Sequence, residues 1–333
     1  MAKISAGADL GDCFERYLQS FLREQSTSSA VYGQIHRHFG CGSDGILRRG
    51  KRLRPAMLGA AARSLGAPLS ATLAAAAAIE LLHNYSLIHD DIEDGDRLRH
   101  GRETLWCQFG LAHGINAGDA VGSLAQLALE PAGKELGFEA AFAMSMELAQ
   151  ANRRMCEGQA LDLELEVAEP RSVTIQTYMT MIEGKTAALF RCAAMLGALC
   201  AAADHDDLRR CSDIGRVFGL GFQIDDDIAG CWGSAEETGK IPASDIARRK
   251  KTYPIVWTME RGPRDAARIV ADACRRQQTP LDEAASREVL DALASAGAQS
   301  AAREAANSYF TQALERAEKF PPLARFIQPW HKA

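Results

Sequence analysis

Residues 69–94 read LSATLAAAAAIELLHNYSLIHDDIED, an apolar stretch that ends in a dense acidic cluster. Its most apolar part, Ala71 to Leu82, contains Glu80 and is too short to span a bilayer, so it predicts a buried helix. The cluster Asp90-Asp91-Ile92-Glu93-Asp94 crowds carboxylates that repel one another and raise each other's pKa unless a cation neutralises them. Oxygen-rich clusters of this kind suit Mg²⁺, which typically links carboxylates to substrate phosphates.

A second acidic cluster, Asp225-Asp226-Asp227, lies far along the chain within residues 221–228, which read GFQIDDDI. On a helix, Gln223, Asp226 and Asp227 stand at positions i, i+3 and i+4, so an amide and two carboxylates share one face. One acidic run alone can be a solvated helix end. Two such clusters in an apolar helical frame predict that a diphosphate is held between them with Mg²⁺.

Alanine- and leucine-rich segments with helical spacing dominate the chain, and no convincing β-alternation is found. No linker or repeat divides it, so the prediction is an all-α fold in a single domain, 1–333. Breaks are expected at Gly40-Cys41-Gly42, Gly66-Ala67-Pro68, Pro131-Ala132-Gly133 and Glu169-Pro170. The expected helices cover residues 9–26, 52–65, 69–97, 117–130, 137–166, 171–203, 206–229, 252–260, 263–276 and 284–318.

The composition narrows the class of protein. The 333 residues are 47% apolar and 24% charged, as in ordinary globular proteins, and the net charge of −5 gives no reason to expect nucleic acid as a partner. Nine cysteines without a CxxC pair favour reduced thiols over a disulfide frame or a zinc site. The N-terminus lacks a signal pattern and no transmembrane segment is predicted, so a cytoplasmic protein is expected.

Basic residues follow both acidic clusters. A lysine run alone is more often an exposed loop, but cations close behind carboxylates fit a metal-bridged phosphate site. Behind the first cluster stand Arg97, Arg99, His100 and Arg102; behind the second stand Thr238-Gly239-Lys240, Asp245 and Arg248-Arg249-Lys250-Lys251.

Two further segments place polar groups near expected helix boundaries. In Gly50-Lys51-Arg52-Leu53-Arg54-Pro55 the proline can open a helix, which would direct two cations and free backbone N–H groups at an anion. A loop with surface charge is the alternative for that segment. Gly184-Lys185-Thr186 interrupts a helical stretch, which exposes carbonyls and hydroxyls. Gln159 and Asp162 add polar groups to an apolar segment and are interpreted as incidental.

Taken together, these motifs resemble the trans-type polyprenyl diphosphate synthases of the class I isoprenoid synthase superfamily. The matching signatures run from Gly50 to Pro254. The family's first aspartate-rich motif, DDxxD, matches residues 90–94, and its second begins at Asp226-Asp227 behind Phe222-Gln223. The resemblance implies a large helical bundle with a central apolar cavity, Mg²⁺ as cofactor and a homodimer.

The resemblance also implies roles for single residues. The magnesium ligands would be Asp90, Asp91, Asp94, Asp226 and Asp227. The allylic diphosphate would contact Arg99, Lys185, Lys240 and Lys250, with Asp245 in support, and isopentenyl diphosphate would contact Lys51, Arg54, His83 and His100. The catalytic set would be Lys185, Thr186, Gln223 and Lys240, with Thr186 and Gln223 near the developing carbocation, and chain length would depend on Tyr85 and Ser86.

The implied activity is condensation of isopentenyl diphosphate with dimethylallyl, geranyl or farnesyl diphosphate to a short-chain all-trans product. Cations would stabilise the departing pyrophosphate, an apolar cavity would exclude water, and a proton would be lost after the isopentenyl double bond attacks. Geranylgeranyl diphosphate is the expected product and farnesyl diphosphate the alternative. A terpene cyclase-like enzyme that uses the same allylic site and a catalytically silent subunit of a heteromeric synthase are the other hypotheses.

Three positions bear on specificity. The family's Arg-Arg-Gly appears here as Arg99-His100-Gly101, which predicts weaker or more pH-dependent isopentenyl diphosphate binding unless Arg102 substitutes. Gly230 takes the place of the second motif's third aspartate and is not interpreted as a loss of activity. Tyr85, five residues before the first aspartate, is an aromatic that favours C15 to C20 products in the family. An ideal helix nevertheless turns it about 140° away from Asp90.

Overall fold

The computed structural model describes residues 10–40, 50–233, 244–276 and 280–331. Most of these residues are helical, and the described strands form one two-stranded ribbon, so the predicted all-α fold is confirmed. A single-domain organisation stays a prediction. The chain divides into two compact units, the first formed by Met1–Asn152, Leu189–Gly215 and Arg316–Phe326, and the second by Arg153–Ala188, Arg216–Glu315 and Ile327–Ala333.

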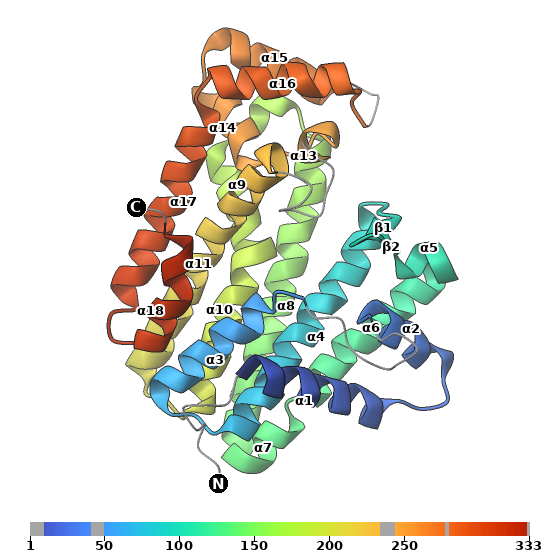
Figure 1. Ribbon diagram of the computed structural model, residues 1–333, viewed down its shortest axis with the longest axis vertical. Coiled ribbons are helices and arrows are strands. Elements are labelled where there is room, and N and C mark those ends of the chain that lie inside the picture. The colour runs from blue at the N-terminus through green and yellow to red at the C-terminus, as the bar shows by residue number, and fades with distance from the viewer. Residues whose placement is uncertain (1–9, 41–49, 234–243, 277–279, 332–333) are drawn as a thin grey trace. The chain divides into compact units, whose positions relative to one another are not determined.

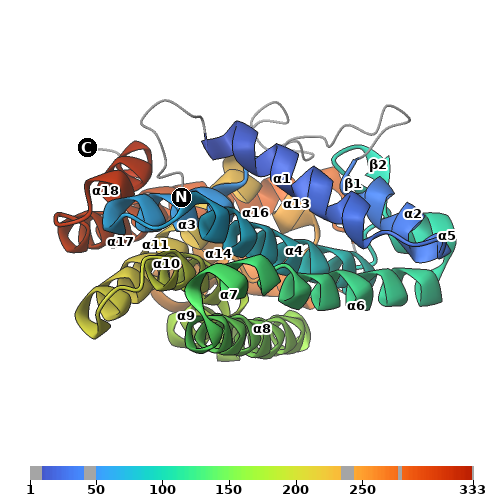
Figure 2. The same cartoon turned by 90° about the horizontal axis from the view of Figure 1, so that it is seen from below.

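The first unit is built around α4 (Leu69–Glu93), whose alanines are all buried, together with Ile79, Leu81 and Leu82. Helices α3 and α6 lie on either side of it (Figure 1 and Figure 2). By length and composition α4 could cross a membrane, but 78% of its most apolar window is buried, as in the core helix of a globular domain. The other elements are α1 (Leu10–Gln25), α2 (Ala30–His38), α3 (Leu53–Leu65), β1 (Leu98–Arg99), β2 (Arg102–Glu103), α5 (Leu105–Phe109), α6 (Leu111–Leu127), α7 (Glu130–Leu136), the first part of α8 (Phe138–Val167), most of α10 (Ala188–Cys200), the first part of α11 (His205–Trp232) and most of α18 (Pro321–Ile327).

The second unit contains the remaining parts of α8 and α11. On α11, Phe218 packs edge-on to Trp330, with ring centroids 5.7 Å apart, and lies 5.6 Å from Phe310. A separate apolar cluster joins α13 to α16, and α15 and α16 lie side by side (Figure 1). The other elements are η1 (Pro170–Ser172), α9 (Ile175–Ile182), the π-helix η2 (Glu183–Ala187), α13 (Ser244–Ala247), α14 (Tyr253–Arg261), α15 (Arg264–Arg275), α16 (Glu283–Ser295), α17 (Ala298–Arg316) and η3 (Gln328–Trp330).

Two predicted long helices are divided. The helix expected over 171–203 is interrupted because Thr174 forms a capping box with Thr177 and starts α9 there. The helix expected over 284–318 breaks at Gly297, which adopts a left-handed φ of 76° that a glycine tolerates without strain. Such a turn ends α16 and allows α17 to start in a new direction.

Other boundaries also differ from the prediction. The helices α2 and α5 and the ribbon β1–β2 were not expected, because elements this short show little periodicity. The helix expected over 69–97 ends at Glu93, and the one expected over 117–130 starts at Leu111. Pro131 does not break a helix but stands in the first turn of α7, where its missing N–H costs nothing.

Candidate active site

The first acidic cluster stands at the C-terminal end of α4. Asp94 is the C-cap of this helix, and its backbone N–H is bonded to the Asp90 carbonyl. Asp91 is buried, and its Oδ1 lies 2.8 Å from Arg99 Nε and 2.7 Å from Arg99 Nη2. Burial raises the pKa of Asp91, and the Arg99 guanidinium opposes that rise. The structure therefore pairs Asp91, a predicted magnesium ligand, with Arg99, a predicted phosphate ligand. The other two aspartates of the motif, Asp90 and Asp94, are half-buried.

The basic segment behind this cluster forms the ribbon β1–β2. Arg99 and Arg102 are paired across it, and His100 and Gly101 make the two-residue turn with φ values of 50° and 75°. Positive φ at both central residues is the geometry of a tight hairpin turn whose twist matches the strands. His100, a predicted ligand of isopentenyl diphosphate, is therefore exposed at the tip of the turn.

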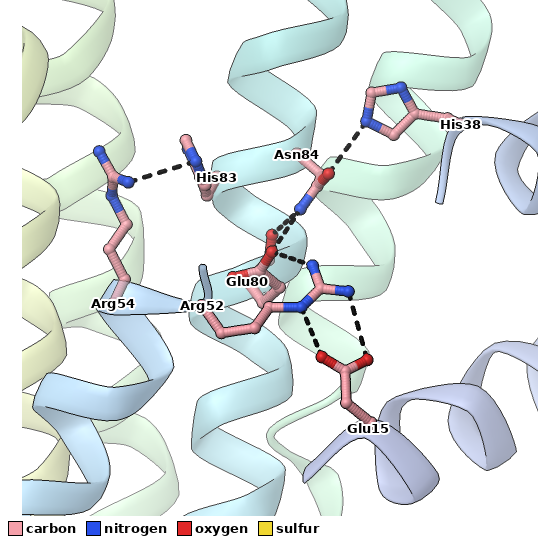
Figure 3. Close-up of polar contacts among 7 residues, drawn as sticks. All are labelled: Glu15, His38, Arg52, Arg54, Glu80, His83 and Asn84. Carbon is pink, nitrogen blue, oxygen red and sulfur yellow. Dashed lines mark hydrogen bonds and ion pairs between the residues drawn. The ribbon is translucent and has the colours of Figure 1, made fainter. Parts of the chain in front are cut away.

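Arg54 and His83, two other predicted isopentenyl diphosphate ligands, are in contact. Arg54 Nη1 on α3 donates to His83 Nε2 on α4 at 3.2 Å (Figure 3). A guanidinium can only donate, so this imidazole nitrogen is an acceptor and His83 is neutral. Burial and the charge of Arg54 lower the pKa of His83 well below its ordinary value. The Arg54 guanidinium also lies over the Phe190 ring, 4.6 Å from its centroid, and Lys51 is exposed just before α3.

Arg52, to which no role was assigned from the sequence, is the centre of a buried polar network. Its Nε donates to Glu15 Oε1 at 2.8 Å, and its Nη1 donates to Glu80 Oε1 at 2.5 Å (Figure 3). Asn84 Nδ2 donates to Glu80 Oε1 at 3.0 Å, and Asn84 Oδ1 faces His38 Nε2 at 3.0 Å. The network thus connects α1, α2 and α4 through Arg52. In the sequence, Arg52 lies between Lys51 and Arg54, two predicted ligands of isopentenyl diphosphate.

In the second unit, Asp227 accepts three hydrogen bonds. Its Oδ2 accepts from the Tyr178 hydroxyl at 2.6 Å and from the Tyr253 backbone N–H at 2.7 Å, and its Oδ1 accepts from Gln223 Nε2 at 2.9 Å. Gln223 Oε1 in turn accepts from Thr186 Oγ1 at 2.6 Å. Burial raises the pKa of Asp227 to about 7, although these donors stabilise the carboxylate.

The two carboxylates of the second cluster are therefore unequal. Asp226 is exposed, whereas Asp227 is buried and holds Gln223 and, through it, Thr186. The magnesium role of both stays a prediction. The helical geometry places Gln223 and Asp227 on one face, as expected from their spacing.

The predicted interruption at Gly184 is the π-helix η2, a distortion that is frequent at functional sites. Helix α8 passes it with the two backbones in contact: a Cβ on Gly184 would lie 2.9 Å from the Gly158 Cα, and one on Gly158 would clash with Lys185. This approach brings Lys185 Nζ to 2.5 Å from Asp162 Oδ2. Asp162, interpreted as incidental from the sequence, is therefore an ion-pair partner of Lys185.

The missing third aspartate of the second motif has a structural counterpart. A Cβ added to Gly230 would clash with Asp245 Oδ2, and Asp245 is itself buried. The space that a side chain at position 230 would need is therefore filled by another carboxylate.

The lysines behind the second cluster differ in their surroundings. Lys240 lies outside the described residues. Lys250 is half-buried. Its neighbour Lys251 is buried and donates to the Glu166 carbonyl at 3.0 Å, in the last turn of α8. Lys251 thus satisfies a carbonyl at a helix end, where a cation is favourable.

The two predicted chain-length residues lie on α4. The Tyr85 ring packs against α6, where a Cβ on Gly122 would lie 3.0 Å from Tyr85 Cδ2, and it stands 4.7 Å from the His89 ring. Ser86 Oγ donates to the His83 carbonyl of the same helix at 2.8 Å. Their role in chain length stays a prediction.

The donor chemistry of both clusters fits Mg²⁺. Within the described ranges no three His, Cys, Asp or Glu side chains form a preformed metal site by themselves. Mg²⁺ commonly binds through one or two carboxylates and completes its shell with water and substrate phosphate oxygens. The half-buried Asp90 and Asp94 and the exposed Asp226 are suited to such open coordination.

Comparison with known proteins agrees with this geometry. The chain is 36% identical over 270 residues to (2E,6E)-farnesyl diphosphate synthase of Mycobacterium tuberculosis (strain ATCC 25618 / H37Rv), which covers 80% of this chain and 73% of the relative. It is 36% identical over 270 residues to geranylgeranyl diphosphate synthase of the same strain, covering 80% and 74%. The crystal structure of geranylgeranyl pyrophosphate synthetase from Pyrococcus horikoshii Ot3 is similar with a TM-score of 0.83, at 28% identity, covering 97% and 98%.

The family itself follows from the extent of these matches. Residues 42–293 match the family model of polyprenyl synthetase, which is more than half of the chain. The matched segment contains both acidic clusters and the segment around Arg54. The chain belongs to the polyprenyl synthetase family.

Proposed function

We propose that this chain is a trans-prenyltransferase that condenses isopentenyl diphosphate with an allylic diphosphate to a short-chain all-trans prenyl diphosphate. Its relatives named farnesyl and geranylgeranyl diphosphate synthase support this chemistry. The observation that carries the proposal is that the first unit holds two sets of charged and polar groups of different kinds. One is the carboxylate cluster with Arg99, and the other is the pair Arg54 and His83. Two such sets suit two diphosphate substrates, only one of which is bound through a metal.

The carboxylate set suits the allylic diphosphate, which must leave as pyrophosphate. Mg²⁺ bound by Asp90, Asp91 and Asp94 would act as a Lewis acid that neutralises the charge on the departing oxygens. The Arg99 guanidinium can donate to the same oxygens in a charge-assisted, two-pronged contact. Its ion pair with Asp91 holds it at the acidic cluster in advance.

The second unit contains the other residues to which the resemblance assigns roles in this chemistry. Asp226 and Asp227 would add carboxylates for Mg²⁺, and Lys185, Lys240 and Lys250 would donate to the diphosphate. The polar chain Thr186–Gln223–Asp227 supports an orienting role, because Asp227 accepts from the Gln223 amide nitrogen and so turns its oxygen toward Thr186. Oxygen dipoles fixed in this way stabilise a carbocation without having to reorganise.

The cationic set suits isopentenyl diphosphate, which keeps its diphosphate throughout the reaction. Lys51, Arg54, His83 and the ribbon would hold it, and no metal is needed if cations alone neutralise the charge. A neutral His83 accepts from Arg54 and has its other ring nitrogen as a donor.

We further propose geranylgeranyl diphosphate as the main product, with farnesyl diphosphate as the alternative. The relatives named for each product are equally similar to this chain, so identity does not separate the two. The Tyr85 ring packs against α6, which supports its proposed role in limiting the length of the product. The neighbouring Ser86 is a small side chain and adds little volume.

A homodimer is proposed on the apolar surface of α6 and α8, with a second copy of this chain as the partner. Phe138 and Phe142 are stacked on α8 and are 81% and 58% exposed, and Met146 follows at the same helical spacing. Ser145 on α8 is bonded to Gln126 on α6, and the latter helix exposes Leu111 and Ile115. The exposed aromatic pair on α8 is the kind of apolar feature that marks interaction sites. The double variant Phe138→Ser with Phe142→Ser is expected to lower the molar mass measured by light scattering to that of a monomer. An unchanged molar mass would show that this surface is not the interface.

A cytoplasmic location is also proposed, and the free thiols support it. Cys192 and Cys200 are buried free thiols. Burial raises the pKa of the Cys200 thiol to about 12, which keeps it protonated and unreactive.

The proposal is tested by measuring pyrophosphate release in the presence of Mg²⁺. Allylic diphosphate and isopentenyl diphosphate are supplied separately and then together. Release is expected only with both, because the cation must be captured by the isopentenyl double bond. Release from the allylic substrate alone, with formation of a cyclic hydrocarbon, would support the cyclase-like alternative instead.

A further inference from the structure

The ribbon places two arginines side by side. Arg99 and Arg102 are directly opposite each other on antiparallel strands. Opposed residues in such a pair project from the same face, with Cβ atoms roughly 5 Å apart. His100 belongs to the turn instead and is exposed, whereas both arginines are half-buried.

Arg102 lies next to the network of Figure 3. Its Nη1 faces the Arg37 carbonyl at 3.4 Å, in the last turn of α2. The next residue, His38, is bonded to Asn84, which precedes Tyr85 and follows His83 on α4 (Figure 3). Arg102 therefore contacts α2 one residue before His38, which belongs to the network of Figure 3.

Electrostatics agree with this placement. Burial lowers the pKa of His38, and the charges of Arg99, Arg102 and Arg52 lower it further. Arg99 and Arg52 also lower the pKa of His83. Several guanidinium groups thus lie near two neutral imidazoles, and two of them, Arg52 and Arg99, are already paired with carboxylates.

We infer that Arg102, rather than His100, supplies the second guanidinium of the ribbon to the diphosphate of isopentenyl diphosphate. This inference rests on the condensation proposed above. A guanidinium stays charged at every relevant pH and can bind phosphate oxygens through two parallel donors. An imidazole has no fork of parallel donors and stands on a shorter side chain. In the proposal, the two phosphate-binding arginines of this segment are Arg99 and Arg102. They are paired across the ribbon and are not adjacent in the sequence.

Steady-state kinetics of Arg102→Gln and His100→Gln test the inference. For Arg102→Gln we expect the KM for isopentenyl diphosphate to rise about tenfold or more, as for loss of one charge-assisted contact, with little change in kcat or in the KM for the allylic substrate. For His100→Gln the rise is expected to stay under about twofold. Arg102→Lys, which keeps the charge but loses the fork, should fall between the two. Arg63→Gln removes an exposed charge in the last turn of α3 and controls for net charge alone.

A second measurement separates binding from folding. Calorimetric titration with isopentenyl diphosphate alone should show weaker binding by Arg102→Gln at a temperature where thermal unfolding confirms that the variant is folded. The inference is overturned if His100→Gln weakens binding more than Arg102→Gln, or if Arg102→Gln binds as the unchanged protein does. If the unchanged protein forms no product from both substrates, the proposed function fails, and this result is distinct from a failure of the Arg102 assignment.

Discussion

Asp245 Oδ2 lies against Gly230, in the space that a side chain at position 230 would occupy. Glycine is required there by close approach of a buried carboxylate and not by backbone conformation. The second acidic motif therefore loses its third aspartate without leaving an empty space, because the carboxylate of Asp245 stands where that residue would begin.

Restoring the third aspartate should destabilise the protein. In Gly230→Asp the new side chain meets Asp245, and overpacking with like charges is expected to lower the free energy of unfolding by about 1–3 kcal/mol. Adding Asp245→Gly to the same chain vacates the space and should recover most of that loss. Urea unfolding of the unchanged protein, the two single variants and the double variant gives the coupling energy between positions 230 and 245. If the two substitutions were strictly additive, the contact would not exist in solution.

Arg52 should contribute strongly to stability. Arg52→Met leaves the buried Glu15 and Glu80 without their cation, and removal of one partner of a buried pair costs about 3–5 kcal/mol. Arg52→Lys keeps the charge but loses the fork, so a smaller loss is expected. Arg153→Lys, in an exposed ion pair with Glu157, is the matched control and should have no measurable effect. Denaturant unfolding measures the free energy of unfolding of all three variants. If Arg52→Met has the same free energy of unfolding as the unchanged protein, the network does not stabilise the fold.

Tyr85 is expected to limit chain length. Tyr85→Ala removes the ring that packs against α6 at Gly122 and should shift the product spectrum toward longer chains. Ser123→Ala on α6 is the control, since it deletes only a hydroxyl that is bonded to its own helix. Products are dephosphorylated and separated by chromatography. An unchanged spectrum for Tyr85→Ala would show that this ring does not limit the product.

His38 should make the fold sensitive to acid. Burial lowers its pKa to about 4, below the ordinary value of 6.5, and its Nε2 faces the Asn84 oxygen because the Asn84 nitrogen is bonded to Glu80. The unfolded chain binds the proton more readily, so the stability is complete above pH 6.5 and is lost as the pH falls toward 4. Between pH 7 and pH 5 the loss from this group is up to about 2 kcal/mol.

Substitution isolates the contribution of His38 from that of other titrating groups. In His38→Gln the amide can still donate to Asn84 but cannot be protonated, so the fall in unfolding free energy from pH 7 to pH 5 should be smaller. Urea unfolding at both pH values measures the difference. Identical pH dependence in the two proteins would contradict a depressed pKa at His38.

Much of the fold follows from local patterns in the sequence. The long apolar stretch that ends at Asp90 predicts a core helix with carboxylates at its end, and α4 has both. Gly184 predicts an interruption, and η2 stands there. Short elements such as α5 carry too little periodicity to be recognised, and a single residue in an alanine-rich run, Gly297, gives a weak signal for a turn.

The connections within the candidate site depend on tertiary contacts that local patterns do not contain. Glu15 and Glu80 come from two helices, and nothing in either segment indicates that both meet Arg52. Asp162 is incidental until a close crossing of two backbones brings Lys185 to it. Glu80, an acidic residue inside the apolar run from Ala71 to Leu82, is the signal that could have suggested such a network.

The central claim is that this chain condenses isopentenyl diphosphate with an allylic diphosphate. Product analysis tests this claim most directly. The protein is incubated with Mg²⁺, labelled isopentenyl diphosphate and, in turn, dimethylallyl, geranyl and farnesyl diphosphate, and the product is identified by mass and chain length. The account predicts label in an all-trans prenyl diphosphate with each primer, converging on the C20 product. Absence of label from every product, with the allylic primers consumed or intact, would contradict it.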